Sequence, residues 1–205
     1  MCQGTEEEMM MMQRRLTTLF ALALLSFVAV ASSPPSSRVV ADSVYAIPML
    51  TLRDQQGQLF DFASLRGKPR LVGMFYGSCQ MACPLEIEYL KHLQRVVAAG
   101  SGKSISVLLV SFDPARDDLA MLRKVAGEHH VWPPAFRLAR TERGDEGMLA
   151  GVLGIAYRQL PGGGFSHNVR VSLLDAQGRI VAATDASGRP APAFLRSVDE
   201  ALKNP

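Results

Sequence analysis

The chain is poor in cysteine and in clustered positive charge. Its 205 residues include three cysteines, too few for a fold held together mainly by disulfide bonds. The formal net charge is +3, and the lysines and arginines are scattered without a dense basic run, so no nucleic-acid partner is expected. No internal repeat is present. The composition, 48% hydrophobic and 20% charged, is that of a globular protein with one domain.

An apolar run near the N-terminus is typical of a targeting segment. Arg14 and Arg15 precede 16 mostly apolar residues, "LTTLFALALLSFVAVA" (16–31), which end in the small-x-small pattern Ala29-Val30-Ala31. Charge, apolar stretch and cleavage pattern follow the order of a secretory signal. The run is short for a transmembrane helix without excluding one. Residues 1–31 are therefore expected to be a cleaved signal peptide or an N-terminal membrane anchor.

The first residues indicate translation from a later methionine. A start at Met12 gives "MQRRL", the basic beginning of a signal peptide, whereas a start at Met1 adds three glutamates, 6–8, which such segments normally lack. We hypothesise that the residues before Met12 are not made and that Cys2 has no role. N-terminal sequencing that recovered a peptide with these glutamates would contradict the hypothesis.

A linker is expected behind the targeting segment. Residues 32–45 are rich in serine and proline, as in a tether between an export segment and a domain. The folded domain is expected over residues 46–205. Export would place Cys79 and Cys83 in an oxidising compartment, where a disulfide between them can form.

The remaining chain alternates predicted strands and helices. Apolar runs and helical spacings predict, in chain order, a hairpin of 50–52 and 59–62, a strand at 71–76, a helix at 84–98, a strand at 105–112, a helix through 119–125, a short strand at 136–139, a helix at 142–153, a hairpin of 169–174 and 179–183, and a helix at 192–202. This order predicts an α/β fold, with a central mixed sheet flanked by helices.

Two cysteines follow the first buried strand. They lie in "FYGSCQMACPLEIEYL" (75–90), where Cys79 and Cys83 precede a helix that begins near Pro84. A helix N-terminus lowers the pKa of a thiol, and the resulting thiolate is both a nucleophile and a soft metal ligand. Three residues separate the sulfurs, one more than in the familiar redox motif. A redox pair, a metal site and a structural disulfide all remain open from these residues alone.

One histidine is placed to complete a metal site. His92 is expected on the helix surface, and His129 and His130 in a surface loop. His167 instead follows the glycine-rich segment "PGGGFS" and directly precedes the strand at 169–174. Such a histidine is commonly structural, and its combination with a thiol pair at a strand end favours metal binding.

These motifs together resemble the Sco/SenC family of thioredoxin-fold copper proteins. The resemblance runs from about residue 47 to 202 and rests on "LRDQQGQLFDFASLRGKPRLVGMFYGSCQMACP", "LLVSFDPARDD" and "FSHNVRVSLLDAQGRIV". It implies a thioredoxin-like fold with an N-terminal and a late β-hairpin. It also implies one copper ion per chain held by Cys79, Cys83 and His167. The family's D-x-x-x-D segment falls on Asp113 and Asp117, which are expected either to contact a partner or to serve as turn and cap residues.

The cysteine loop departs from the family pattern "Y-[TS]-x-C-P-D-x-C-P". Gly77 and Ser78 precede the first cysteine, and Gln80-Met81-Ala82 replace the proline and acid inside the motif. The three ligands are retained, so metal binding is expected to persist while affinity, redox potential and partner choice change. Two thiolates and an imidazole suit Cu(I) and can hold Cu(II), whereas zinc normally takes a fourth ligand.

The resemblance implies a metallochaperone of the bacterial periplasm or cell envelope, tethered through residues 16–31 if they are not cleaved. It would deliver copper to a respiratory oxidase subunit, or prepare the thiols of its copper site with a thiol–disulfide reductant as a further partner. The alternative is a thiol–disulfide oxidoreductase in which Cys79 attacks and Cys83 resolves. A thiol peroxidase is a weaker third interpretation, because it gives His167 no role.

Overall fold

The computed structural model describes residues 43–204. The predicted targeting segment, the start-site hypothesis and the linker up to residue 42 lie outside the described residues. The boundary between linker and domain at residue 45 stays a prediction; the side chains of Val44 and Tyr45, at the end of the expected linker, are buried, each 2% exposed. Within residues 43–204, no helix has both the length and the hydrophobicity to cross a lipid bilayer.

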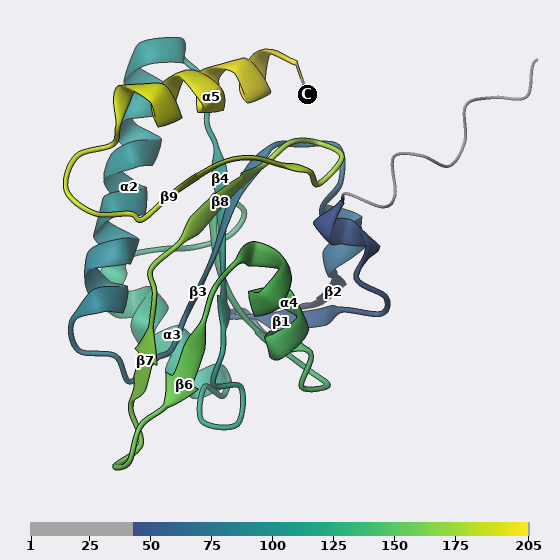
Figure 1. Ribbon diagram of the computed structural model, residues 1–205, viewed down its shortest axis with the longest axis vertical. Coiled ribbons are helices and arrows are strands. Elements are labelled where there is room, and N and C mark those ends of the chain that lie inside the picture. The colour runs from purple at the N-terminus through teal and green to yellow at the C-terminus, as the bar shows by residue number, and fades with distance from the viewer. Residues whose placement is uncertain (1–42, 205) are drawn as a thin grey trace, which may run out of the picture. The chain divides into compact units, whose positions relative to one another are not determined.

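A seven-stranded mixed sheet forms the centre of the fold (Figure 1). Strands β3 and β4 are parallel, as are β4 and β5, whereas β1 and β8 pair antiparallel to β5 and β3. The strands, in their spatial order, are β2 (Leu59–Asp61), β1 (Thr51–Asp54), β5 (Phe136–Thr141), β4 (Ser106–Ser111), β3 (Arg70–Phe75), β8 (Val171–Leu174) and β9 (Ile180–Thr184). The predicted α/β fold and both predicted hairpins are confirmed.

Helices cover both faces of the sheet. They are α2 (Ala82–Ser101), α3 (Leu119–His129), α4 (Glu146–Leu153) and α5 (Pro192–Lys203), with short 3-10 helices η1 (Val44–Ala46) and η2 (Phe62–Leu65). One core joins α2, α3 and α5 to the sheet, and a second joins α4, η1 and η2 to the opposite face. In β3, Leu71 and Phe75 face the first core and Val72 and Met74 the second, as the twofold period of a strand requires.

Two predicted features need correction. The helix expected over 142–153 begins at Glu146, because Glu142 directly follows β5 and forms an ion pair with Arg53 at 2.8 Å. The glycine-rich segment before His167 is not a loop leading straight into β8. It is the turn of an unpredicted hairpin, β6 (Tyr157–Gln159) with β7 (Phe165–His167), which forms a separate two-stranded sheet.

Candidate metal centre

The two thiols lie where β3 gives way to α2. Cys79 is half-buried in the connecting loop, and Cys83 is 2% exposed in the first turn of α2. Pro84 fits this turn because the first N–H groups of a helix have no partner within the helix. The backbone N–H of Cys83 donates a hydrogen bond to Cys79 Sγ at 3.3 Å. The two sulfurs therefore lie close together, with the second beneath the surface.

The two thiols differ in acidity. A hydrogen bond from the Cys83 thiol is the main cause that lowers the pKa of Cys79 to about 4, and the N–H groups of Cys83 and Met81 contribute further. The same hydrogen bond, followed by burial, raises the pKa of Cys83 far above its usual value. At neutral pH the reduced pair therefore holds a thiolate at Cys79 and a thiol at Cys83.

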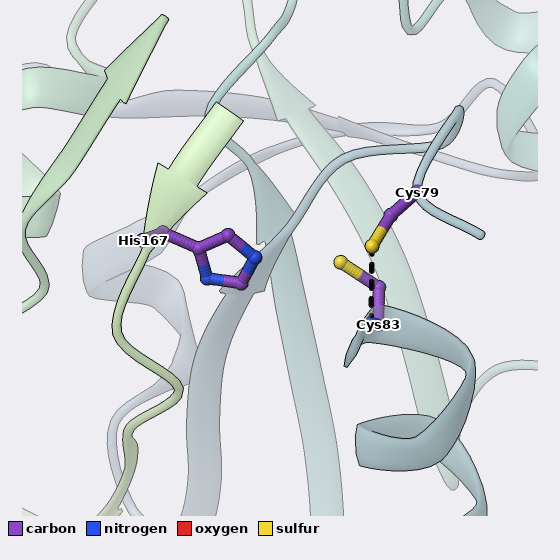
Figure 2. Close-up of side chains that lie close together, drawn as sticks. All are labelled: Cys79, Cys83 and His167. Atoms are coloured by element: carbon purple, nitrogen blue, oxygen red, sulfur yellow. Dashed lines mark hydrogen bonds between the residues drawn. The ribbon is translucent and has the colours of Figure 1, made fainter. Parts of the chain in front are cut away.

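His167 completes a compact set of three ligands. The ligand atoms of Cys79, Cys83 and His167 lie within 4.8 Å of one another, and Figure 2 shows the imidazole ring directed toward both sulfurs. His167 Nδ1 lies 3.2 Å from the carbonyl oxygen of Asn168. A carbonyl only accepts hydrogen bonds, so Nδ1 carries the proton in this contact and Nε2 is free to bind a metal.

The unpredicted hairpin positions the histidine. His167 ends β7 opposite Tyr157, and its ring packs against Phe112, with 5.0 Å between ring centroids, and against Tyr76, with 6.0 Å. Phe165 packs on the same two aromatic rings. These contacts fix the hairpin to the end of β4 and to the loop after β3, so two distant segments meet at one site.

Cys79 and His167 border an open cleft of about 740 Å³, and Cys83 is buried beside it. One wall is the cysteine loop, and the other is the turn of the β6–β7 hairpin beside Arg116. The lining residues are Tyr76, Ser78, Cys79, Gln80, Met81, Ala82, Arg116, Gly162, Gly163, Gly164, Phe165, Ser166 and His167. A small ion or a partner's side chain can therefore reach Cys79 from solvent.

Asp117 holds the start of the cysteine loop. Its side chain is 1% exposed and accepts hydrogen bonds from the Gly77 N–H, at 2.9 Å, and from the Ser111 hydroxyl. Burial is the main cause that raises its pKa. A Cβ at Gly77 would lie 2.7 Å from Asp117 Oδ1 and would also collide with Met121. Glycine at this position, a departure from the family pattern, therefore allows this close contact.

Asp113 is also largely buried, at 7% exposed. It forms an ion pair with Arg116 at 2.5 Å, and its N–H bonds the Ser111 hydroxyl. It does not cap α3, because the cap is Asp118, whose side chain accepts from Met121 N. Asp113 is a turn residue in this structure, and a docking role for Asp113 and Asp117 stays a prediction.

A buried acid near the thiols was not predicted. Glu86 is 1% exposed, and neither of its carboxyl oxygens has a hydrogen-bond partner among the described residues. Its carboxyl occupies space left by Gly73, where a Cβ would lie 2.8 Å from Glu86 Oε1. Burial, with a smaller effect of the Cys79 thiolate, raises its pKa to about 8. The sequence does carry one indication of this burial. Glu86 lies three residues after Cys83 and four before Leu90, a spacing that puts it on the buried face of the helix.

The other histidines lie outside the ligand cluster. His92 and His130 are exposed, as predicted, and His129 contacts Glu88, with 3.1 Å between Nδ1 and Oε1. Sequence and structure therefore agree on His167 as the histidine that accompanies the thiols.

Comparisons with known proteins assign the fold. The copper-bound crystal structure of ScoI from Arabidopsis thaliana aligns with a TM-score of 0.65 and 17% identity, over 76% of this chain and 97% of that one. BsSco, described as a member of the Sco family of cytochrome c oxidase assembly proteins with a disulfide switch, aligns with a TM-score of 0.64 and 19% identity, over 76% and 92%. The fold is that of a thioredoxin-like protein.

The family follows from the sequence match. The SCO1/SenC family matches residues 45–203, and the chain belongs to that family. A protein of Stutzerimonas stutzeri, named as a candidate copper-binding protein, is 30% identical over 78 residues, which are 38% of this chain and 38% of that relative. The suspected Sco/SenC resemblance and the thioredoxin-like fold are thus confirmed.

Proposed function

We propose that the protein binds one copper ion through Cys79, Cys83 and His167 and acts as a metallochaperone of the cell envelope. The observation that carries this proposal is the convergence of two sulfurs and one imidazole nitrogen within 4.8 Å at an open cleft. Thiolates are soft ligands that suit Cu(I), imidazole is a common copper ligand, and the same set can hold Cu(II). Among the His, Cys, Asp and Glu residues of 43–204, no fourth group joins the cluster, which disfavours a structural zinc site.

The difference in acidity suggests how copper is loaded. Cys79 is the thiolate and lines the cleft, so it is the first of the three ligands to bind copper. Cys83 then loses its proton as its sulfur binds, because the thiolate is the metal ligand. His167 closes the set through Nε2, since its Nδ1 faces the carbonyl oxygen of Asn168. Removal of copper by a partner reverses these steps.

The recipient we propose is the copper site of a respiratory oxidase. Support comes from the family assignment and from the description of BsSco as a cytochrome c oxidase assembly protein. Placement in the bacterial periplasm or cell envelope rests on the predicted targeting segment, residues 1–31, which also supplies the proposed membrane tether.

Thiol–disulfide exchange is a second function that the same geometry favours. The Cys79 thiolate would attack a partner's disulfide, forming a mixed disulfide while one partner sulfur leaves as a thiolate. Cys83 would then lose its proton and attack Cys79 Sγ, forming the Cys79–Cys83 disulfide and releasing the second partner thiolate. The lowered pKa of the more accessible cysteine and the raised pKa of the buried one suit these two roles. This reaction would reduce a recipient's disulfide to the two thiols that metal loading needs.

Metal analysis and EPR of purified protein test the copper proposal. Wild-type protein is expected to hold about one copper per chain, with a thiolate-to-Cu(II) charge-transfer band. Cys79→Ser, Cys83→Ser and His167→Ala are each expected to lose tightly held copper. His92→Ala, which changes an exposed histidine outside the cluster, is the control. Equal copper content and identical EPR spectra in His167→Ala and wild type would overturn the assigned ligand set.

A dithiol-exchange assay separates the second function from the first. If Cys83→Ser keeps copper but loses turnover with a disulfide substrate, the oxidoreductase function gains support. Loss of copper together with unchanged single-turnover attack by Cys79 would favour the chaperone.

A further inference from the structure

The side chain of Met81 lies at the mouth of the cleft without a packing role. It is 78% exposed, and it is absent from the partly buried side chains that pack on either core, which do include Met121. An apolar side chain of this size gains nothing in folding stability from such exposure. Its position between Cys79 and Cys83 therefore calls for an explanation outside the core.

Met81 lies close enough to act on the ion held by the cysteines. It lines the same cleft as Cys79 and His167, two residues after Cys79 in the cysteine loop. The methionine side chain is unbranched, with three rotatable bonds. Since no packing contact restrains it, it can place its sulfur next to an ion on Cys79 without movement of the loop.

The cleft offers copper few other soft ligands. Apart from Cys79, the only sulfur among its lining residues belongs to Met81. The opposite wall carries the imidazole of His167, and its other lining residues, which contain no sulfur, are Arg116, Gly162, Gly163, Gly164, Phe165 and Ser166. Thioether sulfur selects Cu(I). It also carries no proton, so it binds Cu(I) without releasing one.

We propose that the Met81 thioether is an exchangeable Cu(I) ligand that receives copper at the cleft mouth and passes it to and from the cysteine pair. The inference rests on the proposed copper function. One Cu–S bond to Met81 forms as a bond to the donor breaks, and the thiolates of Cys79 and Cys83 then replace it. Copper stays Cu(I) throughout, so no oxidant or reductant takes part. The proton of Cys83 passes to solvent.

The test compares Met81→Leu with Met148→Leu in protein with ¹³C-labelled methionine methyl groups. Leucine keeps an apolar side chain of similar volume, and Met148 is a control on α4 that is 50% exposed and outside the cleft lining. On addition of Cu(I) as its acetonitrile complex, we expect the Met81 methyl resonance to shift and the Met148 resonance to stay. Transfer of Cu(I) to bathocuproine disulfonate should slow several-fold in Met81→Leu and remain unchanged in Met148→Leu.

The outcomes separate this inference from the proposed function. If the protein binds Cu(I) while the Met81 methyl stays unmoved, or while Met81→Leu transfers copper at the wild-type rate, the thioether role is wrong and copper binding stands. If the wild-type protein binds no copper, both fail. Circular dichroism of each variant before loading confirms that the fold is retained.

Discussion

The buried carboxyl of Glu86 should make stability depend on pH in a direction opposite to that of an ordinary surface acid. The pKa of Glu86 rises from 4.5 to about 8 on folding, so the folded protein binds this proton more tightly than the unfolded chain. The stability that comes with protonation is complete below pH 4.5 and is lost as the pH rises toward 8. The glutamine side chain in Glu86→Gln cannot ionise, so this variant should not lose stability in this way as the pH rises.

The size of the effect follows from the two pKa values. Each pH unit between them changes the free energy of unfolding by about 1.4 kcal/mol, so the wild type should lose about 4 kcal/mol relative to Glu86→Gln between pH 5 and pH 8.5. What is compared is the change with pH in the free energy of unfolding of each protein. The absolute values differ as well, because the buried amide of Glu86→Gln, which has no partners, adds a roughly constant penalty. This loss is a large fraction of the stability of a typical domain.

Urea unfolding of the reduced, metal-free protein at pH 5, 7 and 8.5 measures this difference. Glu88→Gln is the matched control, since Glu88 lies on the same helix, has a half-exposed side chain and pairs with Lys91; loss of such surface pairs has little effect. If the free energies of unfolding of wild type and Glu86→Gln change in parallel to within about 1 kcal/mol over this range, the carboxyl is hydrated or partnered in solution and the reasoning is refuted.

Two further predictions concern the cysteine loop. Iodoacetamide at pH 6 should label Cys79 well before Cys83, because the pKa of Cys79 is lowered to about 4 and Cys83 is buried. Peptide mass mapping measures the labelling of each cysteine. Equal labelling would contradict the assignment of Cys79 as the thiolate. Gly77→Ala should destabilise the protein by about 1–3 kcal/mol through overpacking, because the new Cβ meets Asp117. Thermal unfolding checks this against Gly100→Ala, whose Cβ meets nothing within 4 Å, and equal melting temperatures would contradict it.

Local sequence signals were sufficient for the main sheet and for the position of the two thiols at a strand end. The apolar runs of β3 and β4 mark buried strands whatever surrounds them, and the thiols were placed correctly because they directly follow such a run. The β6–β7 hairpin carried no comparable signal, since its strands have three residues each and leave Arg158 and Gln159 exposed. Its stability comes from contacts such as the stacked rings of Phe112 and Tyr157, 4.9 Å apart, which only the folded chain brings together.

Glu86 could not be predicted for a different reason. Glutamate is almost never fully buried without a partner, so its place on the apolar face of α2 reads as an irregularity in the pattern. The space for it depends on Gly73 in the neighbouring strand. A glycine within a strand indicates that other atoms pack closely against the backbone. It does not identify the side chain to which those atoms belong.

The β6–β7 hairpin forms its own sheet, outside the hydrogen-bonded ladder of the seven strands. Copper bound between His167 and the cysteines would therefore cross-link this hairpin to the loop after β3, although His167 lies 84 residues after Cys83 in the chain. We expect amide hydrogen exchange in 157–167 to slow on loading. A partner that binds the hairpin would then distinguish copper-loaded from copper-free protein by the reduced mobility of the hairpin, without contacting the ion.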